Sequence, residues 1–248
     1  MRTELLTWAR TWARGRGGAE VHQHMLSVLW QQLGVHMHVL VLASQKGGAG
    51  KTTLSRHLAV EAERAGEGPV VLIDADPQGG LAGWWNRRAA KTPVFFASRL
   101  DDLPKHIEQA RAGGFKLIII DTPPQATSLI QAVVQLADLV LIPTRPSPDD
   151  LDAVGRTIDI VESARKPMVF VINGATKNAR ITGQAAIALS QSGTVASATL
   201  HHSVAFPTSG IDGRTVSELD PSSNSAKEVA ELWSYVSTRL RKSAIVTA

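Results

Sequence analysis

From residue 38 onward, short hydrophobic runs alternate with longer segments in which apolar residues recur at helical spacing. The short runs are continuously apolar and lack the alternation of a half-exposed strand, which is typical of parallel strands buried on both faces. Seven such runs predict strands, at residues 38–44, 69–74, 93–97, 116–121, 138–143, 167–173 and 194–200.

Two of the intervening segments predict helices most clearly. Segment 149–163 opens on two acidic residues, which suit a helix N-terminus, and places Leu151, Val154, Ile158 and Val161 on one face. Segment 225–241 has the same spacing at Val229, Leu232, Trp233, Val236 and Leu240. Such alternation predicts an α/β fold with a doubly wound, mostly parallel sheet flanked by helices. Ligands of these sheets bind at the carboxyl ends of the strands.

Residues 1–36 do not share this alternation, so we expect an N-terminal extension there, helical or poorly ordered, and one α/β domain over residues 37–248. A short helix in the extension would carry a basic, tryptophan-bearing face that could contact membrane or nucleic acid. That face would be formed by Trp8, Arg10, Trp12 and Arg14. The alternative, which we favour, is a poorly ordered extension, or an upstream start codon before a core that begins near Met37.

The composition excludes several classes of protein. The chain has no cysteine, which excludes disulfides, thiolate zinc sites and cysteine-held iron–sulfur clusters. The net charge is +4, and residues 165–248 carry nine basic against five acidic residues. This excess is a weak indication of a polyanionic partner, and ordinary surface charges explain it equally well. No apolar run approaches the roughly 18–20 residues that cross a bilayer, and the N-terminus lacks a signal-peptide core, so we expect a cytoplasmic protein.

The stretch ASQKGGAGKTT, residues 43–53, has the features of a phosphate-binding loop. Its glycines let backbone N–H groups turn toward phosphate oxygens, and the following helix adds its positive N-terminal end. Lys51 is placed to reach the β- and γ-phosphates, Thr52 to offer a hydroxyl to Mg²⁺, and Thr53 to reach the α-phosphate. The common pattern has glycine where this chain has Gln45, and this chain has an additional lysine, Lys46.

Polar residues also follow three other predicted strands. Asp74 and Asp76 form a D-x-D pair, in which one carboxylate can hold a Mg²⁺-bound water while the other orients the attacking water; a lone D-x-D more often caps a turn. Asp121 ends a hydrophobic strand, as a Walker-B-type acid does. Asn173 can pair with an adenine edge or form a turn.

Three motifs in this order, KGGAGKTT, LIDADPQGG and IIIDTPP, resemble the deviant-Walker ATPases of the ParA/MinD group, which are P-loop NTPases. The small ParA proteins of DNA partition are the most similar, since DADPQGGLAGWW, PTRPSPDDLDAV and HHSVAFPTSGIDGRTVSEL also match. The resemblance covers about residues 38–242 and implies a ParA-type ATPase domain over residues 37–248. Residues 1–36 are too short for the DNA-reading domain of the family's large members.

The resemblance implies a role for each matching residue. Lys46 is the signature lysine, which crosses a dimer interface to the partner subunit's ATP. Asp76 is the water-activating aspartate, so the implied catalytic residues are Lys46, Lys51 and Asp76. The implied magnesium site is Thr52, Asp74 and Asp121. The implied nucleotide-binding residues are Lys46, Gly47, Gly48, Ala49, Gly50, Lys51, Thr52, Thr53 and Asn173.

The implied activity is Mg²⁺-dependent hydrolysis of ATP that stays weak until a partner and DNA stimulate it. The ATP-bound homodimer would bind DNA without sequence preference and drive plasmid or chromosome partition with a ParB-like centromere-binding partner. We therefore expect nucleoid association and no membrane contact. The candidate DNA contacts, taken from the basic C-terminal third, are Lys177, Arg180, Arg214, Lys227, Arg239, Arg241 and Lys242.

Other functions are open on the same motifs. Relatives position protein cargo, such as chemoreceptor arrays or microcompartments, with the same ATPase cycle and a cargo adaptor. A MinD-like membrane ATPase would need an amphipathic anchor beyond the last domain helix, where only SAIVTA follows. A dethiobiotin-synthetase-like ligase would need a pocket for an acyl substrate, which no motif indicates. Nitrogenase-iron-protein and arsenite-pump relatives require cysteines, which this chain lacks.

Overall fold

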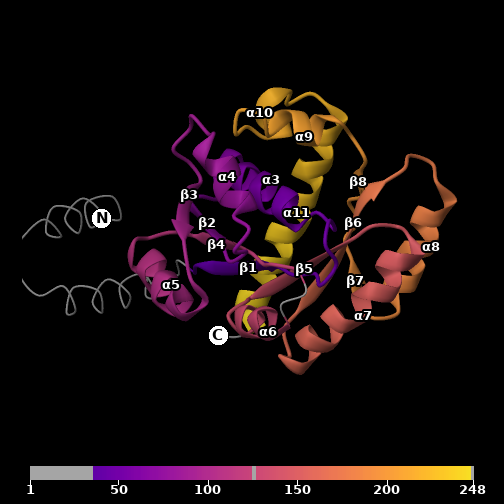
Figure 1. Cartoon of the computed structure of the whole chain (residues 1–248), viewed down its shortest axis with the longest axis horizontal. Helices are drawn as coiled ribbons and strands as arrows, with labels where there is room; N and C mark the ends of the chain where they lie inside the picture. The colour runs from indigo at the N-terminus through magenta and orange to yellow at the C-terminus, as the bar shows by residue number, and fades with distance from the viewer. Residues whose placement is uncertain (1–35, 125–126, 247–248) are drawn as a thin grey trace, which may run out of the picture.

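The computed structural model describes residues 36–124 and 127–246, with side chains up to Lys242. The predicted N-terminal extension therefore lies outside the described residues except for His36. Within the described part, the strands form one parallel sheet in the order β3-β2-β4-β1-β5-β6-β7, and β8 also pairs with β6 (Figure 1). The strands are β1 His38–Leu42, β2 Val70–Asp74, β3 Val94–Ala97, β4 Leu117–Asp121, β5 Leu139–Thr144, β6 Met168–Ala175, β7 Thr194–Val195 and β8 Leu200–His201.

The predicted doubly wound parallel sheet is confirmed, and six of the seven predicted strands occur within two residues of their predicted bounds. The seventh prediction, one strand over 194–200, is wrong. The segment instead forms two short strands, β7 and β8, which pair with β6 in succession. The register of β6 shifts between Asn173 and Ala175, so one straight partner strand cannot follow it along its whole length.

Helices cover both faces of the sheet. The helices are α3 Lys51–Arg64, α4 Gly80–Asn86, α5 Leu103–Ala112, α6 Thr127–Gln135, α7 Pro148–Ser163, α8 Arg180–Ser190, α9 Ala205–Ser209, α10 Val216–Leu219 and α11 Asn224–Val246, with a 3₁₀ turn, η1, at Leu100–Asp102. One core contains the buried faces of α3, α4 and α11, and the other contains those of α5, α6 and α7 (Figure 1).

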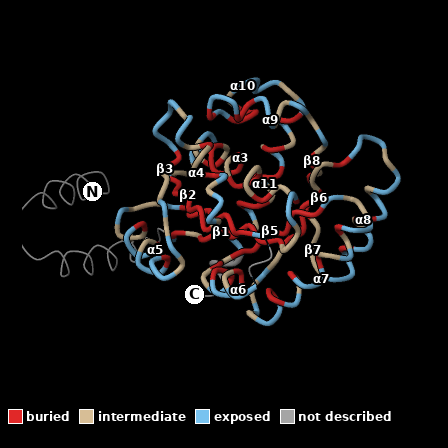
Figure 2. Tube along the Cα trace, in the orientation of Figure 1, coloured by how far each residue is buried: buried red, intermediate tan, exposed pale blue. Residues whose placement is uncertain are grey.

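The sequence pattern accounts for these two cores. Successive residues of a strand point to opposite faces, so Leu40 and Leu42 enter one core while Val39 and Val41 enter the other. The central strands are consequently buried along nearly their whole length (Figure 2). None of the helices in the described ranges is long and apolar enough to cross a membrane.

The two clearly predicted helices are confirmed, with different bounds. Helix α7 begins at Pro148, because the Ser147 hydroxyl accepts a hydrogen bond from Asp150 N and caps the first turn. Val154 and Val161 are buried as predicted, whereas Leu151 and Ile158 are only half-buried. Helix α11 extends to Val246, beyond its predicted end at 241, and all five of its predicted apolar positions are buried.

Candidate nucleotide-binding site

The carboxyl ends of three neighbouring strands bring the predicted acids to the predicted loop. Asp121, the last residue of β4, is paired in register with Asp74 at the end of β2 and with Leu42 at the end of β1. The loop over residues 43–50 leaves β1 at this point and leads into α3. The parallel sheet therefore gathers residues that are separated by up to 79 positions in the sequence.

The loop depends on glycine at two positions. Gly48 and Gly50 have φ values of 74° and 104°, which residues with a side chain rarely adopt. A Cβ on Gly50 would also lie 2.1 Å from Asn173 Nδ2. Gly50 is the N-cap of α3 and, having no side chain, makes no cap hydrogen bond to the amides of the first helical turn. Those amides are the groups that bind phosphate at a helix N-terminus.

The two lysines of the loop have different surroundings. Lys51 is buried, and its ammonium donates to the carbonyl oxygens of Ser44, at 2.9 Å, and Lys46, at 3.4 Å. Burial lowers the pKa of Lys51, while Asp121 and Asp76 oppose that shift. Lys46 is half-buried, and its ammonium has no hydrogen-bond or ion-pair partner within residues 36–124 and 127–242.

Asp121 and Thr52 have the chemistry of a magnesium site. Thr52 Oγ1 donates to Asp121 Oδ2 at 2.6 Å, whereas Asp121 Oδ1 is buried and has no partner in the part of the chain that the structure describes. Burial raises the pKa of Asp121 to about 7, and the hydrogen bond from Thr52 lowers it in part. A buried carboxylate oxygen that lacks a donor fits a hard cation or a water bound to one. These two residues would hold Mg²⁺.

The residues of the D-x-D pair have separate contacts. Asp74 Oδ1 accepts from Asp76 N at 3.0 Å, and Oδ2 accepts from Leu81 N at 3.1 Å and Ala82 N at 2.9 Å. Asp74 therefore caps α4, as the turn-cap alternative anticipated, and its role as a magnesium acid stays a prediction. Asp76 lines the cavity beside the loop, and its Oδ1 accepts from Gln78 N at 2.9 Å.

A cavity of about 710 Å³ opens beside the loop. Most of the implied nucleotide-binding residues line it, namely Gly47, Gly48, Gly50, Lys51, Thr52, Thr53 and Asn173, as does Asp76. Lys46 and Ala49 do not line it. Asn173 Nδ2 donates to the Ala49 carbonyl at 2.7 Å, so the amide braces the loop, and its contact with adenine stays a prediction.

Sequence reasoning missed several cavity residues, among them Arg145 and His201. Arg145 follows β5, and its Nη2 lies 3.6 Å from the position that a Cβ on Gly48 would take. His201 lies in β8, where its Nδ1 pairs with Glu228 Oε1 of α11 at 2.8 Å. Both residues stand at or just after the end of a strand, which is the signal that could have identified them.

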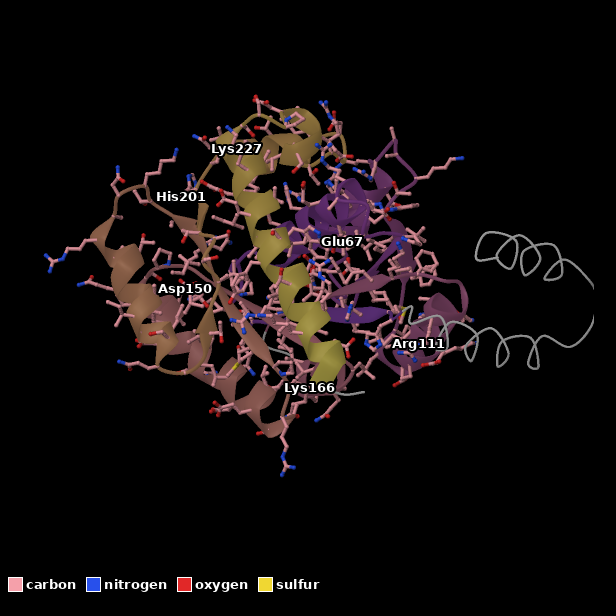
Figure 3. All side chains as sticks on the ribbon, turned by 180° about the vertical axis from the view of Figure 1, so that it is seen from behind. Glu67, Arg111, Asp150, Lys166, His201 and Lys227 are labelled. Carbon is pink, nitrogen blue, oxygen red and sulfur yellow. The ribbon has the colours of Figure 1, made fainter. Side chains whose placement is uncertain are left out.

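The candidate DNA-binding residues do not form one group of unpaired cations. Arg241 pairs with Glu67 at 3.2 Å, Arg214 pairs with Asp212 at 2.8 Å, and the Arg239 guanidinium lies over the Tyr235 ring. Lys227 lies in the first turn of α11, at the same end of that helix as His201 (Figure 3). Lys177, Arg180, Lys227 and Lys242 are exposed.

The parallel sheet, the glycine loop at the end of β1 and the acids at the ends of β2 and β4 define a P-loop nucleotide-binding protein whose loop carries a second lysine. The chain belongs to the CobQ/CobB/MinD/ParA nucleotide-binding domain family, whose model matches residues 40–216.

Named relatives match about half of the chain. "Maintenance of carboxysome distribution protein A" of Gloeobacter kilaueensis is 40% identical over 122 residues, which is 48% of this chain and 55% of the relative. "Protein ParA" of Rhizobium radiobacter is 33% identical over 129 residues, 50% of this chain and 56% of the relative. The chain thus spans about half the length of the curated relatives that it matches.

Solved structures share the fold at low sequence identity. An ATP complex of McdA from Cyanothece has a TM-score of 0.65 at 20% identity, covering 84% of this chain and 98% of that one. The MinD cell division protein of Aquifex aeolicus has a TM-score of 0.68 at 19% identity, covering 81% of this chain and 97% of that one.

The buried Asp121 predicts a dependence of stability on pH in the absence of nucleotide and magnesium. Its pKa of about 7 lies above the usual value of 3.8, so the folded state holds this proton more tightly than the unfolded state. The resulting stability is present at low pH and is lost as the pH rises through 7. The free energy of unfolding in urea should fall by roughly 2–3 kcal/mol from this group between about pH 5 and 8.

Asp121→Asn should remove that loss, because the amide can still accept from Thr52 and carries no charge to bury. Asp152→Asn, a change at an exposed position of α7, is the matched control and should behave as the wild type does. If the free energy of unfolding depends on pH equally in the wild type and in Asp121→Asn, Asp121 is not the cause of this dependence.

Proposed function

We propose that this chain is an ATPase that dimerises when it binds ATP, separates after hydrolysis, and binds DNA without sequence preference as an ATP dimer in order to position a cargo. One observation carries the proposal. Of two lysines in one phosphate loop, Lys51 lines the chain's own cavity, whereas Lys46 lies outside it, and its ammonium has no partner among the described residues.

A second lysine that lies outside its own subunit's cavity could contact the nucleotide of a partner subunit. Two nucleotide sites brought face to face would repel each other, because a triphosphate with Mg²⁺ keeps net negative charge. A lysine from each subunit placed on the other subunit's phosphates replaces that repulsion with charge-assisted hydrogen bonds. Because each subunit would give and receive one lysine, the interface would have twofold symmetry.

Different residues at the loop would bind the phosphates, hold the metal and orient the attacking water. When bound, ATP supplies the scissile phosphoanhydride and Mg²⁺ neutralises charge that develops on it. Lys51 and the α3 amides would hold the phosphates, while Thr52 and Asp121 would hold the metal. Asp76 would orient water with Oδ2, since its Oδ1 is occupied by the Gln78 amide.

Arg145 should add a positive charge to the nucleotide cavity. Its guanidinium lies over Gly48, and within the described chain no carboxylate pairs with it. Arg145→Ala should weaken binding of ATP about tenfold and binding of ADP less, because a charge-assisted hydrogen bond to an outer phosphate is lost. Titration of both nucleotides by calorimetry measures this effect. Arg180 is exposed at the start of α8 and lies outside the cavity, so Arg180→Ala is the control. Unchanged affinity for ATP in Arg145→Ala would contradict the contact of Arg145 with the phosphates.

The proposed binding of DNA is tested with duplexes of unrelated sequence. Binding in ATP should be similar for each duplex, much weaker in ADP, and strongly dependent on salt. If about six phosphates are contacted, the affinity should fall about 10³-fold between about 50 and 200 mM salt. An affinity for DNA that is the same in ATP and ADP, or that does not change with ionic strength, would refute non-specific binding by the ATP dimer.

The names of the matching relatives support two kinds of cargo. One relative acts in carboxysome distribution and another is named ParA, so positioning of a protein assembly and partition of DNA with a ParB-like partner are both candidates. The higher identity favours the protein cargo. Deletion of the gene should then leave plasmid inheritance intact and disturb the spacing of a protein assembly, whereas loss of a plasmid would favour partition.

A further inference from the structure

Two histidines and a carboxylate meet at the amino ends of the central strands, at the edge of the sheet opposite the phosphate loop. His36 and His38 flank Met37, which is buried in one core. Because side chains of an extended segment alternate, the two imidazoles share a side, and their ring centres lie 4.8 Å apart.

The carboxylate comes from the neighbouring strand and is held in place. Asp138 directly precedes β5, which pairs with β1. Its backbone N donates to Val39 O at 2.9 Å, and its Oδ2 accepts from Val39 N at 2.8 Å. This reciprocal pair fixes the orientation of the carboxyl group and leaves Oδ1 outside the contact.

The three side chains can supply ligands to one point. One nitrogen or oxygen atom from each of His36, His38 and Asp138 lies within 4.8 Å of the others. His38 Nδ1 is buried and has no hydrogen-bond partner within residues 36–124 and 127–242. A buried imidazole nitrogen without a partner is costly, and a bound cation would remove that cost.

The adjoining cavity has room for a further ligand of the ion. It measures about 240 Å³, and His36, His38 and Trp233 line it. Trp233 is 4% exposed, and its indole nitrogen is also buried and lacks a partner among the residues that the structure describes. Arg241 lines the same cavity, where its charge is offset by the ion pair with Glu67.

We propose that His36, His38 and Asp138 hold a divalent transition-metal ion, for which Zn²⁺ is the best match. Two imidazoles and one carboxylate form a ligand set that zinc accepts at three positions, with a fourth open to water. Mg²⁺ prefers oxygen ligands alone, which separates this site chemically from the one at Thr52 and Asp121. The ion would tie the start of β1 to the start of β5.

Metal binding by the untagged, EDTA-treated chain without nucleotide tests this proposal. Equilibrium dialysis against Zn²⁺ should give one ion per chain at micromolar concentrations, and Co²⁺ as a spectroscopic probe should show visible absorption that Zn²⁺ abolishes. His36→Gln and Asp138→Asn should each weaken Zn²⁺ binding at least tenfold. His202→Gln, an exposed histidine of the nucleotide cavity, should not.

The two substitutions differ in how much they could disturb folding. Asp138→Asn keeps an acceptor for Val39 N, and its unfolding in EDTA should match that of the wild type. Should it fail to fold, His36→Gln decides alone, because His36 is exposed at the sheet edge. Absence of Zn²⁺ binding at tens of micromolar by the wild type, or full binding by His36→Gln, would overturn the proposal.

Discussion

Lys46→Ala should remain a monomer in ATP under conditions in which the wild type is a dimer. Each dimer would lose two charge-assisted contacts, one in each direction, and each is worth about 1.5–3 kcal/mol. The dimer dissociation constant should therefore rise at least about 100-fold. Lys46→Gln should behave like Lys46→Ala. Its amide can still donate hydrogen bonds, but it lacks the positive charge that offsets the negative charge of the phosphates. Sedimentation velocity in ATP measures the effect.

The same variant should still bind ATP as a monomer. Lys51 contacts the loop through its own hydrogen bonds, and Lys46 does not line the cavity. Lys91→Ala, at an exposed position between α4 and β3, is the matched control for loss of a lysine and should dimerise normally. Dimerisation of Lys46→Ala at wild-type strength would refute the role of Lys46.

Asp76→Ala should have the opposite effect on the dimer, trapping it in the ATP state with turnover nearly abolished. Asp76 lines the cavity. In the proposed mechanism it takes a proton from water, and loss of such a group typically costs about 10²–10⁴ in rate. The cost to the fold should be small, because within the described residues its Oδ1 accepts a hydrogen bond from the Gln78 amide alone, across a short turn. Phosphate release reports the turnover, and sedimentation in ATP reports the lifetime of the dimer.

Asp76→Asn separates the structural role of this residue, which is to accept a hydrogen bond from Gln78, from its proposed role as a proton acceptor. The amide can keep the hydrogen bond from Gln78 but cannot accept a proton, so its turnover should fall as far as that of Asp76→Ala. If either variant hydrolyses ATP at the wild-type rate, water activation belongs to another residue.

The sequence predicted those features of the site that depend on local pattern. The glycines, Lys51 and Thr52 follow a buried strand, so their place in a phosphate loop could be read directly. Asp74 and Asp76 lie two positions apart and give the same local signal. Only the fold shows that Asp74 accepts three backbone amides, two of them from α4, while Asp76 faces the cavity.

Contacts between distant segments could not be predicted. The basic C-terminal third gave no sign that Arg241 pairs with Glu67, 174 positions earlier. Likewise Asn173 gave no sign that its amide would brace Ala49. The division of the last predicted strand into β7 and β8 follows from the irregular register of β6, which has no local sequence signal.

Mixing two inactive variants shows whether Lys46 acts on the partner subunit's nucleotide. Lys51→Ala should fail to hold its own ATP yet keep Lys46, while Lys46→Ala should bind ATP yet lack the crossing lysine. In a mixed dimer, Lys46 of the first variant would complete the site of the second. The mixture should therefore dimerise and release phosphate in ATP, although neither variant does so alone. A mixture as inactive as its two components would contradict this role of Lys46.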